Sequence, residues 1–177
     1  MLSGVSFEPI VASGENSSKP HAVPTERMVQ EKDIITIDMG CKINGYCSDM
    51  TRTIFVGEMT KEQEDLYNLI LKNQKNVINR IKDGINIKSL SKEVINDFNI
   101  NGYDLVHSLG HGVGLEIHEK PYLNMKTENL LKENMVITDE PGIYIPGNFG
   151  IRIEDTILVT KLGSRVLTES SKECIIL

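Results

Sequence analysis

Four carboxylates stand in segments that are otherwise rich in apolar residues. Asp38 and Asp49 flank the dipeptide Asn44-Gly45, and a second pair, Glu140 and Glu154, lies farther along the chain. Aspartate is depleted in β-strands, and burying a carboxylate without a compensating cation is costly. Carboxylates in such segments therefore favour a cation site. A helix N-cap or a salt-bridged edge aspartate is the alternative for the first pair.

Three of the four histidines fall close together, at His107, His111 and His118. The first two stand in the glycine-rich segment HSLGHGVG, where the backbone can approach a ligand closely. Imidazole is a common metal ligand and a common acid or base near neutral pH. We favour a ligand or catalytic role over the alternative, which is a polar residue with a satisfied hydrogen bond.

Four carboxylates and an imidazole form an oxygen-rich ligand set. Such a set suits Mn²⁺ and also admits Co²⁺, Fe²⁺ or Zn²⁺, but it differs from a structural cysteine-zinc site. Two ions about 3.5–4 Å apart can lower the pKa of a shared water and polarise a carbonyl, so amide hydrolysis then needs no protein nucleophile. The sequence has neither GxSxG nor GxxxxGK[ST]. A calcium-binding structural domain is the alternative, but an EF-hand loop is absent and a histidine ligand would be unusual.

A β-hairpin is expected to position the first carboxylate pair. DIITIDMG and GYCSDMTRTIFVG are joined through Asn44-Gly45, which supplies the two positive φ angles of a type I′ turn. Centring the hairpin there places Asp38 opposite Thr51 and Gly40 opposite Asp49. Asp38 and Asp49 then lie diagonally on one face, with Cα atoms about 7–8 Å apart.

A second hairpin is expected from MVITDEPGIYI and FGIRIEDTILVT, which are separated by the turn residues PGN. Glu140 and Glu154 are equally distant from Gly147, so they face each other. Like charges in that position repel. A divalent metal resolves the repulsion.

The remaining segments predict two helices and two short strands. The capping box of Thr60 and Gln63 begins a helix that continues until Gly84, and a shorter helix covers residues 89–98. Residues 9–13 and GLEIHE, which contains His118, have the pattern of strands, and GENSSKPHAVPTER, which contains His21, has that of a loop. Strands on either side of two helices predict a single α+β domain.

Composition narrows the classes of partner. The net charge is −6 and no long basic run occurs, so neither nucleic acid nor an anionic membrane is expected as a partner. No apolar stretch approaches a membrane span, and the N-terminus lacks a signal-peptide pattern, so we expect a cytoplasmic protein. The three cysteines are expected to be reduced thiols.

Five blocks of sequence resemble the pita-bread metallopeptidases, the family of methionine aminopeptidases, Xaa-Pro aminopeptidases and prolidases. They are IDMG, CSDMTRTIFVG, HSLGHGVGLEIHE, ITDEPGIYIPG and GIRIEDTILVT. The resemblance implies the pita-bread (creatinase/aminopeptidase) α+β fold, a curved antiparallel sheet covered by helices. Residues 1–177 would form a single catalytic domain that is truncated at its N-terminus relative to the family and corresponds to the C-terminal part of the family's catalytic domain.

The same resemblance implies roles for individual residues and two divalent metal ions, with manganese favoured and cobalt, zinc or iron possible. Asp38 would bind one metal, Asp49 and Glu154 would bridge both, and His111 with Glu140 would bind the second. Glu140 would also carry the proton of the nucleophilic water. His21 and His118 would contact the substrate, Arg152 would lie near the ligands, and His107 would line the pocket.

Two pairs of blocks resemble the proline-specific branch: PGIYIPG with GIRIEDT, and FEPIVASGEN with KPHAVPT. The implied reaction is hydrolysis of the bond between an N-terminal residue and a following proline, on a peptide partner with proline second. A methionine aminopeptidase and a non-catalytic binding module of the same fold are the alternatives, and a homo-oligomer is left open. Asp139 departs from the family pattern, which usually has an apolar residue there. Alternation along a strand predicts that it points away from the metals.

Overall fold

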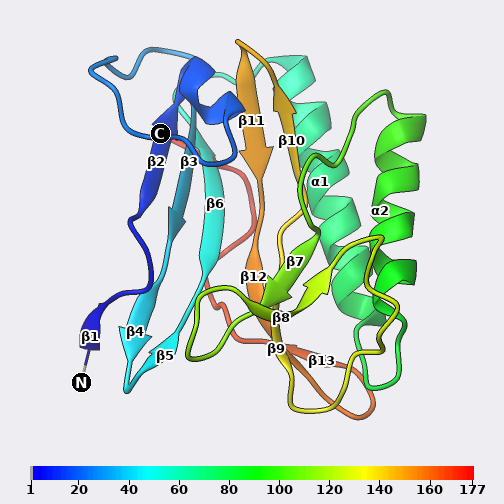
Figure 1. Cartoon of the computed structure of the whole chain (residues 1–177). Helices are drawn as coiled ribbons and strands as arrows, with labels where there is room; N and C mark the ends of the chain where they lie inside the picture. The colour runs from blue at the N-terminus through cyan, green and yellow to red at the C-terminus, as the bar shows by residue number, and fades with distance from the viewer. Residues whose placement is uncertain (1) are drawn as a thin grey trace.

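The structure, a computed structural model, describes residues 2–177. Two β-rich halves lie side by side, and two helices pack against one of them (Figure 1). The arrangement is the predicted α+β class, and the first half of the chain supplies one hairpin while the second half supplies the other. The cavity described below lies between residues of the two halves.

The half of the molecule that contains the first hairpin is a four-stranded sheet in the order β14-β6-β3-β2. Its strands are β2 (Ile10–Ser13), β3 (Ile34–Met39), β6 (Met50–Phe55) and β14 (Ile175–Ile176). Asp38 faces Thr51 across β3 and β6, which confirms the predicted register. The sheet is not wholly antiparallel, because β14 pairs parallel with β6 and brings the last residues of the chain against it.

The tip of this hairpin forms a separate small sheet. It contains β1 (Leu2–Val5), β4 (Cys41–Ile43) and β5 (Tyr46–Cys47), and Asn44 and Gly45 have φ angles of 52° and 88° as the type I′ turn requires. Gly40 and Asp49 lie outside the assigned strands, but the pairs on either side, Met39 with Met50 and Lys42 with Cys47, keep the predicted register. A side chain at Gly40 would overlap the carbonyl of Ser48, so the two segments approach closely there.

The second half is a five-stranded sheet in the order β13-β12-β9-β7-β8, continued by the pair β10 and β11. The strands are β7 (Gly110–Gly112), β8 (Glu119–Leu123), β9 (Val136–Asp139), β10 (Gly142–Ile145), β11 (Phe149–Arg152), β12 (Asp155–Val159) and β13 (Ser164–Val166). Gly142 pairs with Arg152 and Asp139 with Asp155. These pairings share the predicted centre at Gly147, so Glu140 and Glu154 lie between them on facing segments.

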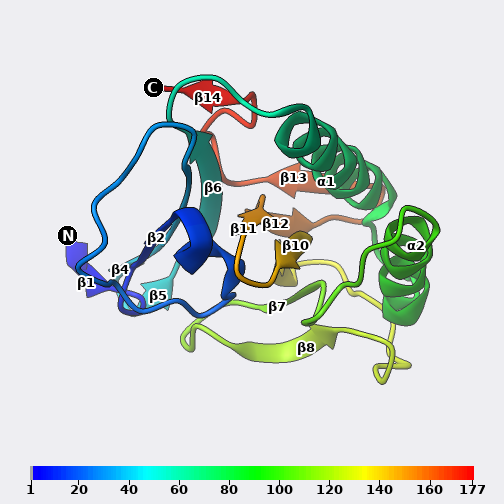
Figure 2. The ribbon, with the colours of Figure 1, turned by 90° about the horizontal axis from the view of Figure 1, so that it is seen from above.

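Helices α1 (Lys61–Arg80) and α2 (Ile87–Ile100) cover this second half (Figure 2). Thr60 and Gln63 form the predicted capping box at the start of α1, and Asn86 caps α2. The apolar stripes of both helices pack into one core with the strands of the second half. Among residues 2–177, the structure has no helix that is both long and apolar enough to cross a membrane.

Several local predictions differ from the structure. Helix α1 ends at Arg80 and not at Gly84, because Ile81 already has an extended backbone (φ −62°, ψ 122°). The loop after β2 begins with a short 3-10 helix, η1 (Gly14–Ser18). Residues 114–118 form bends rather than the predicted strand, and the strand β8 begins only at Glu119. Local bonds replace a strand ladder there, because the Gly114 amide donates to the Glu116 carbonyl and the Glu116 amide donates to the Glu119 carboxylate.

Candidate metal centre

A cavity of about 460 Å³ lies where the two halves meet. It contains every residue to which the sequence analysis gave a ligand or catalytic role. The lining residues are Phe7, Glu8, Ile10, Pro20, His21, Asp38, Asp49, His107, Ser108, His111, Ile117, His118, Tyr122, Glu140, Arg152 and Glu154. The predicted site residues therefore come together, although they are drawn from segments more than a hundred positions apart.

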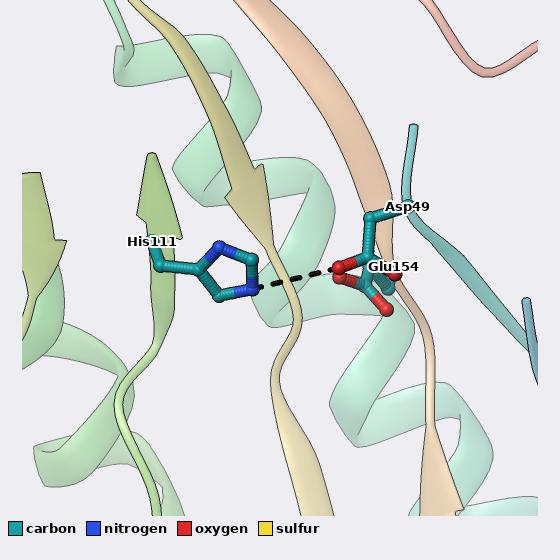
Figure 3. Close-up of side chains that lie close together, drawn as sticks. All are labelled: Asp49, His111 and Glu154. Carbon is teal, nitrogen blue, oxygen red and sulfur yellow. Dashed lines mark ion pairs between the residues drawn. The ribbon is translucent and has the colours of Figure 1, made fainter. Parts of the chain in front are cut away.

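Asp49, His111 and Glu154 form the tightest group in the cavity (Figure 3). Each offers a ligand atom, and these atoms lie within 4.8 Å of one another. Asp49 immediately precedes β6, His111 lies on β7, and Glu154 lies between β11 and β12. All three are buried. Such a spacing is suited to a single ion held by two carboxylates and an imidazole.

The orientation of His111 leaves one ring nitrogen for a ligand. Its Nδ1 lies 3.0 Å from the Gly112 carbonyl, which can only accept a hydrogen bond, so Nδ1 carries the proton. Nε2 is then the unprotonated nitrogen, and it lies 3.5 Å from Asp49 Oδ2 and 3.3 Å from Glu140 Oε1. A metal-binding histidine typically has this arrangement, in which a carbonyl fixes the other ring nitrogen.

The glycines around His111 allow this strand to approach its neighbour. A side chain at Gly110 would overlap the carbonyl of Thr138 on β9. In return, Thr138 Oγ1 accepts a bond from the His111 amide at 3.0 Å and donates to Glu140 Oε1 at 3.2 Å. The HSLGHGVG segment thus brings His111 and Glu140 to the same part of the cavity.

Several buried carboxylate oxygens have no hydrogen-bond partner among residues 2–177. Three of them, Asp38 Oδ1, Asp49 Oδ1 and Glu154 Oε1, lie at the cavity, and the other two are the oxygens of Asp139, which does not line it. An unsatisfied buried acceptor costs about 1–3 kcal/mol, and more when it is charged. Three such oxygens beside an unprotonated imidazole nitrogen fit divalent cations, which accept oxygen and nitrogen donors together.

Burial and mutual repulsion change the protonation of this group. Burial, followed by the charges of Asp38 and Glu140, raises the pKa of Asp49 to about 8. Burial also raises the pKa of Glu140 to about 7 and that of Glu154 well above its usual range. Burial lowers the pKa of His111 to about 4. Because His111 is neutral near pH 7, its contact with Asp49, dashed in Figure 3, is not a charged pair at that pH.

Arg152 holds the fifth candidate ligand, Asp38, in place. Its Nη2 donates to Asp38 Oδ2 at 2.6 Å, and its Nε donates to Thr51 Oγ1 at 3.0 Å. Its Nη1 donates to the hydroxyl of Tyr144 at 2.7 Å and to the carbonyl of Pro20 at 3.1 Å. Arg152 therefore occupies one oxygen of Asp38 and leaves Oδ1 facing no other protein donor among the described residues.

The remaining histidines, which come from three different segments of the chain, also line the cavity. His118 packs edge to face against His111, with ring centroids 4.4 Å apart, although it lies in the bend before β8 and not on a strand. His21 follows η1 and is exposed. His107 Nδ1 lies 2.8 Å from the Ser108 carbonyl and Nε2 lies 3.1 Å from the Tyr144 hydroxyl. Burial lowers the pKa of His107 to about 4.

Sequence reasoning missed several polar residues of the site: Glu8, Ser108 and Tyr122 line the cavity, and Thr51 and Tyr144 bond to its other residues. Thr51 donates to Glu154 Oε2 at 2.6 Å, and Tyr144 bonds to Arg152. The signal for Thr51 was present, because the predicted hairpin register already placed it opposite Asp38. No local pattern singled out Tyr144. As predicted, Asp139 is not among the cavity-lining residues; it is fully buried, and burial raises its pKa well above the usual range.

Comparison with known proteins gives concordant results. The model of metallopeptidase family M24 matches residues 1–161. The Xaa-Pro dipeptidase of Pyrococcus furiosus is 45% identical over 170 residues, which are 94% of this chain and 49% of the relative. A prolidase structure from Thermococcus sibiricus has a TM-score of 0.97 at 38% identity and covers 99% of this chain and 48% of its own.

An X-Pro aminopeptidase structure from Thermotoga maritima has a TM-score of 0.95 at 36% identity, over 99% of this chain and 50% of its own. The chain thus spans about half the length of the relatives it matches. The match to prolidase structures confirms the predicted pita-bread fold. The family model covers most of the sequence. The chain belongs to metallopeptidase family M24.

Proposed function

We propose that this chain carries the metal-dependent centre of a peptidase that cleaves the bond between an N-terminal residue and a following proline. One observation supports this proposal above the others. Candidate ligands from two separate hairpins and one glycine-flanked strand converge on one cavity, and they include buried oxygens without a protein partner among the described residues. Bound cations would compensate the cost of burying these carboxylates close together.

Five side chains would hold a pair of divalent ions. In the arrangement that we propose, Asp38 serves one ion, His111 and Glu140 serve the other, and Asp49 and Glu154 serve both. When bound, ions of this kind lower the pKa of a water and polarise a substrate carbonyl. The oxygen-rich donor set favours Mn²⁺, with Co²⁺, Fe²⁺ and Zn²⁺ as competitors. The close approach of Asp49, His111 and Glu154 supports the proposed set of ligands.

Glu140 is the proposed proton carrier. Burial raises its pKa to about 7 in the absence of a cation, so both of its protonation states are accessible near neutral pH. Thr138 donates to Oε1 and fixes the orientation of the carboxyl group. Glu140 would take the proton of the attacking water and give it to the leaving nitrogen, which must be protonated to depart.

The substrate would lie against the histidines. We assign His118, which packs on His111, and His21 to contacts with the substrate carbonyl and the leaving group. His107 would line the wall of the pocket. Phe7, Ile10 and Ile117 supply apolar surface in the same cavity, which suits the ring of proline.

The names of the relatives support the preference for proline. Those relatives include an Xaa-Pro dipeptidase and an X-Pro aminopeptidase, which differ in the length of peptide they are named for. We therefore propose a peptide with proline in the second position as the substrate class. The length beyond proline is a question for the assay.

The assay loads the metal-free chain with Mn²⁺ and offers Ala-Pro, Ala-Pro-Ala and Met-Ala-Ser. Selective release of alanine is expected, and the ratio of the first two substrates reports the preferred length. A Glu140→Gln chain, which keeps the shape of the side chain but not its acid-base chemistry, is the matched control and should be inactive. Preferential release of methionine, or no release from any peptide by a folded and metal-loaded chain, would refute the proposal.

A further inference from the structure

Arg52 joins the two halves of the molecule behind the cavity. It lies on β6, next to Thr51, and its side chain is only 7% exposed. All five of its N–H groups are directed at acceptors. Nε donates to Ser171 O at 2.9 Å, Nη1 to Thr51 O at 2.8 Å and to Glu154 O at 2.5 Å, and Nη2 to Asp155 Oδ1 and Ser170 O, both at 2.8 Å.

These bonds connect segments that no regular ladder joins. β6 belongs to the four-stranded sheet, whereas Glu154 and Asp155 stand at the start of β12 in the other sheet. Other bonds also cross between the halves: Thr51 Oγ1 donates to Glu154 Oε2 at 2.6 Å, Arg152 Nη2 donates to Asp38 Oδ2 at 2.6 Å, and Thr53 Oγ1 donates to the Arg152 carbonyl at 2.9 Å. Two more bonds lie close to Arg52. The Glu154 amide donates to the Thr51 carbonyl at 3.1 Å, and Thr156 Oγ1 donates to the Asp49 carbonyl at 2.7 Å.

The acceptor side chain in this link is anchored from several directions. Asp155 is fully buried and also accepts bonds from Gln74 on α1 at 2.8 Å and from Lys172 at 2.6 Å. Its partner across the ladder is Asp139, a second fully buried carboxylate. Arg52 and Lys172 thus both form salt bridges with Asp155.

We propose that Arg52 is a positioning residue for the metal centre: it sets the separation of Asp49 and Glu154 by clamping the backbone of Glu154 and the side chain of Asp155 to β6. The inference rests on the proposed function, in which Asp49 and Glu154 bind the same ions. Arg52 contacts the Glu154 carbonyl directly, while Asp49 stands three positions before Arg52 on the same segment.

The planar guanidinium suits this task better than an ammonium group. Its donors have a fixed fork geometry. Its bonds to the carbonyls of Thr51 and Glu154 and to the carboxylate of Asp155 therefore fix the position of β6 relative to the start of β12. A pair of ions about 3.5–4 Å apart tolerates little change in the distance between its bridging carboxylates. Arg52→Lys keeps the positive charge that balances Asp155 but removes the fork.

The test compares Arg52→Lys with two variants in the full chain. Arg165→Lys makes the same exchange at an exposed position on β13. Lys172→Met removes the other cation bound to Asp155 but leaves the bonds of Arg52 to backbone carbonyls in place. For each metal-free protein, Mn²⁺ affinity is measured by calorimetry, the visible absorption spectrum of bound Co²⁺ is recorded, and the melting temperature is determined.

Arg52→Lys should weaken Mn²⁺ binding by about tenfold to a hundredfold, the range expected when a residue that orients a ligand is lost. Its Co²⁺ spectrum should change, because the geometry of coordination changes. Arg165→Lys should behave as wild type. Lys172→Met should lower the melting temperature while its Mn²⁺ affinity and Co²⁺ spectrum stay near those of wild type, so that stability and positioning separate.

An unchanged Mn²⁺ affinity and Co²⁺ spectrum in a folded Arg52→Lys chain would overturn the inference about Arg52 but leave the proposed function standing. Equal losses in Arg52→Lys and Lys172→Met would also overturn it, because they would indicate a general effect of stability. If Arg52→Lys does not fold, Asp155→Asn decides: weaker Mn²⁺ binding is expected, and wild-type binding would contradict the inference. A wild-type chain that binds no Mn²⁺ would remove the proposed function as well.

Discussion

The two metal-bearing hairpins use the same device with different support. Each places a pair of carboxylates near facing positions around a central turn, Asp38 and Asp49 in one and Glu140 and Glu154 in the other. The second hairpin packs beneath α1 and α2, and Ile151, close to its ligands, is fully buried. The first hairpin meets α1 at the end of β6 away from its ligands, where Phe55 packs edge to face against Tyr67 with ring centroids 5.6 Å apart.

The difference is visible in the residues on the outer side of the first sheet. Val11, which pairs with Ile37, is 52% exposed, and Met39 is 44% exposed. The inner side of that sheet is closed by contrast, with Ala12 and Thr36 buried. Ligand geometry can therefore be the same in both halves while the packing free energy behind the ligands is not.

The largest expected effect tests the part that the hairpins share. Asp49→Asn and Glu154→Gln each remove one proposed bridging charge, one from each hairpin. Because loss of a merely orienting residue costs about 10–100-fold in metal affinity, loss of a bridging ligand should cost more than about 100-fold. Calorimetric titration with Mn²⁺ measures both. A large loss in one variant and wild-type binding in the other would break the equivalence of the two hairpins.

The next effect tests the part that they do not share. Ile151→Ala removes a fully buried side chain in the second hairpin and should lower the free energy of unfolding by about 2–5 kcal/mol. Val11→Ala, on the outer side of the first sheet, should change it by no more than about 0.5 kcal/mol. Urea denaturation of the metal-free chains measures both values. Similar losses would mean that the first sheet is covered in solution.

The carboxylates of both hairpins should also make metal stabilisation depend on pH. The folded-state pKa values of Asp49 and Glu140, about 8 and about 7, lie above their ordinary values. The metal-free chain therefore loses the stability contributed by their bound protons as the pH rises through these values. The lowered pKa of His111, about 4, acts in the opposite direction, but only below its ordinary value.

Between pH 6.5 and 9, the metal-free chain should thus become less stable. Mn²⁺ binding displaces the same protons, so it should tighten by up to about tenfold per pH unit for each displaced proton, until the carboxylates are ionised. The rise in melting temperature on adding Mn²⁺ should grow over this interval. A constant rise would show that the carboxylates are already ionised at pH 6.5.

The smallest effect concerns the helix that supports the second hairpin. Thr60→Ala removes the side chain that accepts a bond from the Gln63 amide at the start of α1. The expected loss in the free energy of unfolding is about 1 kcal/mol, with unchanged Mn²⁺ affinity, because the cap lies outside the cavity. Thr60→Ser, which retains the hydroxyl, should recover most of the loss. Weaker Mn²⁺ binding in Thr60→Ala would link the helix end to the site.

Local sequence signals predicted the elements that depend on local chemistry. Asn44-Gly45 fixed the register of the first hairpin and Gly147 that of the second, and the box of Thr60 and Gln63 marked the start of α1. The bend at residues 114–118 was missed because its bonds to Glu119 are made by a side chain rather than by a strand partner. A two-residue periodicity cannot reveal that competition.

The sequence predicted the residues that line the site but not the bonds that hold them in position. Carboxylates in apolar strands and clustered histidines identified the residues that line the cavity. The links that hold the halves together, such as Arg52 with Asp155 and Arg152 with Asp38, join residues of different sheets. Which side chains meet there depends on how the two sheets pack, and no pattern within one segment contains that information.

The central claim is that both hairpins serve one pair of ions. Electron paramagnetic resonance of the chain loaded with two equivalents of Mn²⁺ tests it most directly, because two ions about 3.5–4 Å apart interact magnetically. The account predicts the spectrum of a spin-coupled Mn²⁺ pair, lost in Asp49→Asn and in Glu154→Gln. Spectra of isolated or free Mn²⁺ ions in the wild-type chain would contradict it.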